Sequence, residues 1–106
     1  YTIVAISAAG CVSDPQVVTI TIAPEPVVST TLDKSVCSDL PIALTLNTNG
    51  TSIGAADYNI INQTIAAGLT PGGANAVVPA NGVAAAYLAS DVFTNNTNGP
   101  LTVTYT

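Results

Sequence analysis

The chain of 106 residues contains no histidine, arginine, methionine or tryptophan, and its only basic side chain is Lys34. Without histidine, no Ser-His-Asp or Cys-His nucleophile can form, and no imidazole is present to act as an acid or base near neutral pH. One lysine cannot neutralise the several phosphates that nucleic-acid binding requires, and it cannot hold the chain on anionic lipid. The composition therefore excludes nucleic-acid partners and predicts that the protein is not an enzyme.

Aromatic residues and long hydrophobic runs are also scarce. Aromatic residues make up 5% of the chain although 48% of it is hydrophobic, so a core must be built from Val, Ile, Leu and Ala, which favours thin, sheet-rich packing. The mean hydropathy is +0.52, but no apolar run approaches the roughly 18 residues that a membrane-spanning helix needs. The length fits one domain, and we expect no membrane insertion.

Cys11 and Cys37 are the only sulfur-containing residues. Two cysteines cannot build a structural zinc site without histidine or further cysteines. A disulfide is the favoured use, which would place the chain outside the reducing cytoplasm. The alternative is two reduced thiols that pack as small apolar groups. From the disulfide we expect an extracellular or cell-surface location.

Short β-branched segments separated by Gly, Pro and Asn turns predict an all-β fold, an immunoglobulin-like antiparallel β-sandwich. The alanine-rich stretch before Ser90 adds one short helical turn near Ala84 to Phe93, because alanine favours helix. The expected strands cover residues 1–9, 16–23, 27–32, 41–47, 57–64, a brief one at 76–79, and 101–106.

The clearest boundary is Pro24-Glu25-Pro26, where two prolines fix φ and remove two amide donors from any sheet. The end of the chain, Leu101–Thr106, and its start, Tyr1–Ile6, look like halves of one strand. We therefore expect residues 1–26 to be the last two strands of a preceding or neighbouring repeat plus the linker, and residues 27–106 to be the first part of a repeat that the next copy completes.

In such a rotated domain, Cys37 lies near the beginning and Cys11 of the next copy lies near the end. A disulfide between these adjacent copies would tie the first strand to the last hairpin. Because it closes a long loop, it would stabilise the domain by about 3–5 kcal/mol in the chain-entropy model.

Several segments together resemble a known family of repeats. They are Val36–Asp39, Leu101–Thr106, Ala9–Gln16 with Val17–Ala23 and Pro24–Val27 after it, Gly54–Asn62 and Ala67–Ala76. They are similar to the PKD-like, immunoglobulin-like tandem repeats of giant cell-surface proteins of Bacteroidetes, including gliding-motility adhesins that the type IX system exports. The resemblance implies a β-sandwich repeated along an extracellular stalk, with the paired cysteines inside one rotated domain. Such repeats often carry a central tryptophan, whose place Tyr58 can fill.

Asp14 and Asp39 flank the two cysteines, and a disulfide would bring their loops together. Carboxylates and loop carbonyls are ligands that calcium prefers, so these two are the candidate metal residues. The alternative is that each caps its own turn, since the D-x-D-x-D density of a calcium loop is absent. For Lys34, a crosslinking isopeptide bond is the alternative to an ordinary solvent-facing side chain.

We therefore expect a non-catalytic structural repeat of a long adhesin stalk or filament on a bacterial surface, supporting adhesion or gliding motility and carrying no cofactor. Its partners would be neighbouring copies, joined through terminal strands, and surface glycans or other surface proteins. The alternatives are a glycan- or protein-binding module, a subunit of a filament whose separate chains donate a strand to one another, and an accessory domain of a secreted enzyme.

Overall fold

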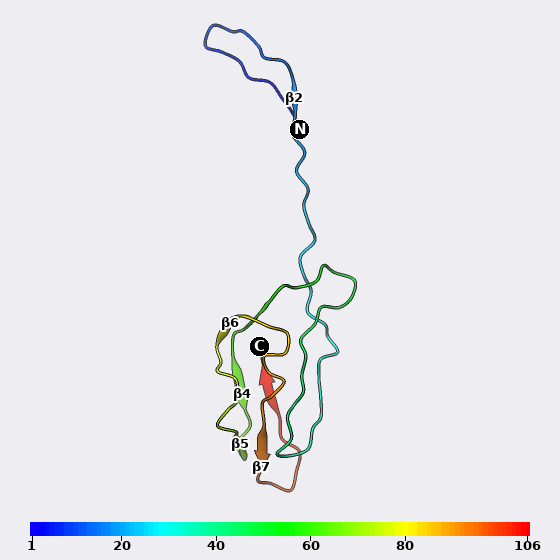
Figure 1. The fold of residues 1–106 in the computed structure, drawn as a ribbon, viewed down its shortest axis with the longest axis vertical. Coiled ribbons are helices and arrows are strands. Elements are labelled where there is room, and N and C mark those ends of the chain that lie inside the picture. The colour runs from blue at the N-terminus through cyan, green and yellow to red at the C-terminus, as the bar shows by residue number, and fades with distance from the viewer.

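The computed structural model describes residues 1–106 and is elongated, with extents of 82 × 26 × 18 Å. Figure 1 shows two parts, which we call the arm (residues 1–26) and the body (residues 27–106). The arm is a hairpin that continues into a single extended strand, and it stands clear of the body. All regular elements are β-strands in antiparallel pairs, and no helix is present. The all-β antiparallel prediction is confirmed.

The arm is held together by a short ladder. Strands β1 (Thr2–Ile3) and β2 (Gln16–Val17) pair with Thr2 opposite Val17. One step further, Tyr1 and Val18 exchange two backbone hydrogen bonds of 2.8 and 2.9 Å. The hairpin turns at Gly10, whose φ of +83° is readily accessible only to glycine. Beyond Val18, the backbone of residues 19–26 has no hydrogen-bond partner.

The body contains three strand pairs. Strand β3 (Tyr58–Ile60) pairs with β6 (Ala80–Val83), β4 (Gln63–Ile65) with β8 (Val103–Tyr105), and β5 (Leu69–Pro71) with β7 (Phe93–Asn95). Figure 1 shows these pairs beside the long loop of residues 27–49, which leaves the linker, descends the body and returns. The returning half of this loop is extended, and three of its amides donate to carbonyls of residues 85–91.

The helical turn predicted near Ala84 to Phe93 is wrong. The segment instead forms three consecutive turns, in each of which a backbone amide donates to the carbonyl three residues earlier. The bonds run from Tyr87 to Ala84, from Ala89 to Ala86 and from Asp91 to Leu88. Carbonyls in this segment accept from Ile42, Ala43 and Leu46 of the neighbouring loop, at 2.8 to 2.9 Å. The amides of the segment thus bond three residues back, whereas an α-helix requires bonds four residues back.

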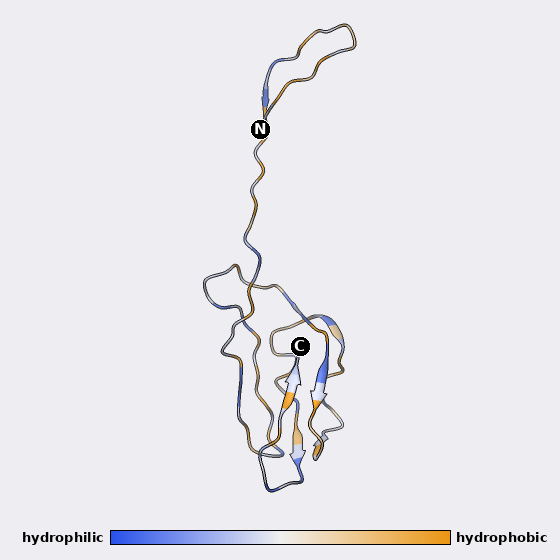
Figure 2. Cartoon of the chain, turned by 180° about the vertical axis from the view of Figure 1, so that it is seen from behind, coloured by the Kyte–Doolittle hydropathy of each residue, from blue (hydrophilic) through white to orange (hydrophobic).

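Few side chains are buried. The only buried apolar residues are Ile60, Leu88 and Phe93, and the only buried polar one is Asp91. Figure 2 shows hydrophobic segments along the arm and along the loop of the body. The single chain is therefore not a compact sandwich, and the immunoglobulin-like part of the prediction is not met within it. No helix long and apolar enough to cross a bilayer occurs in the structure.

Candidate assembly site

A groove of about 830 Å³ runs along the body between β8 and the loop of residues 28–46. Most of its lining is apolar. The apolar residues that line it include Val28, Leu32, Val36, Ile42, Leu44, Leu46, Tyr58, Ile60, Leu69, Phe93, Leu101, Val103 and Tyr105. Side chains that would form the centre of a sandwich therefore face an open channel.

One wall of the groove is the unpaired edge of β8. This strand pairs only with β4. On that side, Thr106 N donates to Asn62 O at 3.0 Å, and Thr102 O accepts from Ala66 N at 3.1 Å. Since backbone groups of an antiparallel strand alternate in direction, those of Val103 and Tyr105 point away from β4. An edge of this kind is a template for another strand.

Asp91 fixes the position of β8 inside the body. Its carboxylate is fully buried and accepts hydrogen bonds from Tyr105 Oη at 2.6 Å and from Ala76 N at 2.7 Å. Burial, together with the hydrogen bond to Asp91, raises the pKa of Tyr105 far above its usual value. The tyrosine therefore remains a neutral donor, and the edge strand is tied to the turn segment behind it.

The arm presents the complementary features. All of its residues are exposed, including Ile20 at 62% and Ile22 at 85%. These two side chains lie on one face of the extended strand, because side chains alternate along it, and Thr21 lies on the other. Residues 19–26 of the arm thus form an apolar extended segment that pairs with nothing in its own chain, and the body carries an apolar groove that its own chain does not fill.

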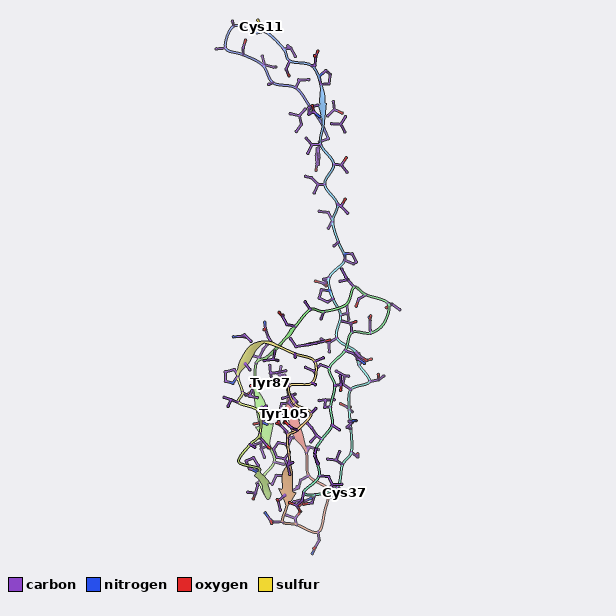
Figure 3. All side chains as sticks on the ribbon, in the orientation of Figure 1. Cys11, Cys37, Tyr87 and Tyr105 are labelled. Atoms are coloured by element: carbon purple, nitrogen blue, oxygen red, sulfur yellow. The ribbon has the colours of Figure 1, made fainter.

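The two cysteines lie at opposite ends of the molecule, both exposed and both free thiols (Figure 3). Cys11 follows Gly10 at the tip of the arm. Cys37 lies at the end of the body that is farther from the linker, where the neighbouring Ser38 Oγ accepts from Asn95 N at 2.9 Å. One chain cannot join them, so their pairing stays a prediction about contacts between copies.

The two candidate metal residues are not brought together. Asp39, at a φ of +67°, accepts hydrogen bonds from Thr94 Oγ1 and Ser38 Oγ. These bonds, that of Thr94 first, lower the pKa of Asp39. Asp14 lies in the arm, and nowhere do three His, Cys, Asp or Glu side chains form a metal-binding group. Within one chain, Asp39 serves as a turn-stabilising acceptor.

The remaining predicted residues have simpler surroundings. Pro24, Glu25 and Pro26 lie in the exposed stretch without backbone hydrogen bonds, as a linker would. Lys34 Nζ donates to the carbonyl of Ala43. Sequence reasoning missed the role of Asp91, because Ser90-Asp91 after a run of alanines is equally typical of a helix end. The burial of an acidic residue depends on Tyr105, which is remote in sequence.

Comparison of the chain with protein-family models, with curated proteins and with solved structures found no match in any of the three.

Proposed function

We propose that the protein is a non-catalytic structural repeat whose copies join when the arm of one copy fills the groove of another. The observation that carries this proposal is the coexistence, in one chain, of an exposed apolar strand and an apolar groove bordered by a free strand edge. Each surface lacks the partner that the other one supplies. Addition of a strand to an exposed sheet edge is a common mode of protein recognition.

The proposal also explains the small core of the body. Three buried apolar side chains are few for 80 residues, since folding of a domain this small depends on burying most of its apolar surface. An arm in the groove would cover β8 and the loop of residues 28–46 and add a strand beside β8. The completed unit would then be the immunoglobulin-like sandwich that the sequence resembles.

The wider role follows from this contact. Copies joined in this way form an extended series, which suits the stalk or filament of an extracellular adhesin that supports adhesion or gliding. The sequence resemblance and the two cysteines support this setting. The same contact serves covalently linked repeats and separate strand-donating subunits. A glycan-binding module is less favoured, because Tyr87 and Tyr105 bond to Val77 O and Asp91 instead of forming an open stacking surface.

The association of copies tests the proposal. Wild-type chain should associate in a concentration-dependent way in sedimentation or light scattering. Ile22→Asp should weaken this association at least tenfold, because it places a charge in the apolar groove. Thr21→Asp adds the same charge on the opposite face of the strand and is the matched control, with an effect of less than about threefold. A wild-type chain that stays monomeric at all concentrations, or equal effects of the two variants, would overturn the proposal.

A further inference from the structure

The ladder of the arm defines how a second copy would bind. Because Tyr1 lies opposite Val18 and Thr2 opposite Val17, a strand that continues the ladder past Tyr1 must run opposite residues 19–24. Strand β8 of another copy can take this place. Its Thr106 then lies opposite Thr19, and its Leu101 lies opposite Pro24, where the missing amide ends the ladder.

The hydrogen-bonding parity of the two strands agrees with this register. Tyr1 and Val18 form a hydrogen-bonded pair, so the next bonded positions along the arm are Ile20 and Ile22. In the register above, they face Tyr105 and Val103, whose backbone groups point away from β4. Paired residues also share a face of the sheet. The two isoleucines therefore lie on the same side as Tyr105, whose hydroxyl reaches the buried Asp91.

This register separates the tip of a bound arm from Cys37 of the copy that binds it. Cys37 and Leu101 both line the groove, and Cys37 lies at the end that is farther from the linker (Figure 3). Asn95 donates hydrogen bonds both to Ser38 Oγ and to Gly99 O, so the start of the segment that leads into β8 lies near Cys37. From Leu101, the ladder runs five residues to Thr106 and seven more to Ser7 beside the tip. At about 3.3 Å per residue, this distance is roughly 40 Å. The Cα atoms of a disulfide lie at most about 7 Å apart.

The tip reaches a different Cys37, and residue counts along the axis identify it. Consider three successive copies, in which the second fills the groove of the first and the third fills that of the second. Cys37 of the first copy is level with Pro24 of the second, about three residues before Val27 of the second.

In the second copy, the chain descends ten residues from Val27 to Cys37, and β8 retraces about five of them from Leu101 to Thr106. The arm of the third copy continues seven residues beyond Thr106. Its tip therefore passes Val27 of the second copy by about two residues, toward the first copy. Cys37 of the first copy lies three residues beyond Val27 of the second copy in the same direction. Cys11 of the third copy and Cys37 of the first copy therefore lie at the same joint, and their positions along the axis differ by about one residue rise, roughly 3 Å.

From this geometry, and on the basis of the proposed function, we propose that Cys11 forms a disulfide with Cys37 two copies away, across the joint between neighbouring bodies. Two thiols become one disulfide, and their two electrons and two protons pass to a disulfide oxidant such as glutathione disulfide, which is reduced to two thiols. The bond bridges the Pro24-Glu25-Pro26 linker and limits rotation between the bodies. The pairing of adjacent copies expected from the sequence would have to cross the length of a body.

A single chain of three full copies, in which Thr106 of each copy is joined by a peptide bond to Tyr1 of the next, tests the pairing. One variant keeps only Cys37 of the first copy and Cys11 of the third, with serine at the other cysteine positions. Its matched control keeps Cys37 of the first copy and Cys11 of the second. Both are refolded in a mixture of reduced and oxidised glutathione. Non-reducing peptide mapping by mass spectrometry should find the Cys11–Cys37 peptide at least tenfold more abundant in the first variant.

Hydrogen exchange at the amides of Val103 and Tyr105 separates this inference from the proposed function. Protection at least tenfold greater than in the dilute single chain shows that arms fill grooves. If that protection is found but the crosslink forms in the control instead of the first variant, or in neither, the proposed pairing is overturned. The proposed function then still stands. Without that protection, the proposed function itself fails, and the pairing fails with it.

Discussion

The arm and the body are built from the same kinds of residues but differ in what surrounds them. Ile22 in the arm is 85% exposed, whereas Ile60 in the body is 4% exposed, although both lie in extended β-branched segments. Ile60 lies in β3, which pairs with β6, and it lines the inner wall of the body's groove. An extended strand thus gains little stability from its own conformation, and its stability depends on the residues that cover its side chains.

Removal of a core side chain should give the largest difference between the two regions. We expect Phe93→Ala to lower the free energy of unfolding of the dilute chain by about 3–5 kcal/mol, because it leaves a cavity in a core of only three apolar residues. Ile22→Ala, in the arm, should change it by less than about 0.5 kcal/mol. Urea unfolding followed by circular dichroism measures both. Similar losses for the two variants would show that the arm packs on its own body.

The buried polar network should give the next largest effect. We expect Asp91→Ala to cost about 1–3 kcal/mol, because it leaves Tyr105 Oη and Ala76 N without their acceptor inside the body. Tyr105→Phe should cost less, since the phenyl ring still fills its place. In the double variant, the two losses should not add, because one interaction is removed twice. Additive losses would indicate that the two groups act independently.

Alkaline pH should weaken the body through Tyr105. The pKa of Tyr105 is raised in the folded chain, so its contribution to stability is complete below its usual pKa of 10.0 and decreases as the pH rises above that value. Stability should therefore fall above about pH 10. Unfolding curves of wild type and Tyr105→Phe between pH 8 and 11 check this, and the variant should show the smaller decrease. Equal decreases would assign the effect to the other tyrosines.

Loss of the thiols should have the smallest effect on a single chain. We expect the double variant Cys11→Ser and Cys37→Ser to unfold within about 0.5 kcal/mol of wild type, because both thiols are exposed and lie at opposite ends. Addition of reductant should likewise leave the dilute wild type unchanged. A large shift in either experiment would mean that the two cysteines meet within one chain.

The sequence predicts part of the local structure. The extended character of residues 58–65 and 101–106 follows from their β-branched side chains, and the hairpin of the arm follows from the turn residues after residue 9. Its turn lies earlier than the expected gap of residues 10–15, at residues 7–11, because Val12 pairs with Ile6. The segments 27–32, 41–47 and 76–79, expected as strands, form no strand beyond isolated bridges at Val28 and Pro41. The strands that it misses have other causes. Strand β5 contains Pro71 and follows Gly68, so it is typical of a loop, and β7 ends in the polar run Thr94-Asn95. Both form because they pair with each other.

The candidate site depends still more on contacts between residues that are distant in sequence. The open edge of β8 exists because β4 binds only its other side, and no local pattern around Val103 reports this. The groove requires the loop of residues 28–46 to lie across from β8, which is set by amides of Ile42 and Ala43 that bond to the turns at residues 89–91. Periodicity identifies which side chains are apolar, but not which of them remain uncovered.

The arm and the groove are different surfaces at different ends of the molecule, and this difference has a consequence for any assembly built from them. A contact between unlike surfaces does not pair two copies symmetrically as a two-fold contact does, so it builds a ring if the rotation between copies closes and an open series if it does not. Such a series is polar: one end presents an empty groove and the other presents a bare strand. An open series of this kind would keep adding copies at its ends until a module of another shape capped them.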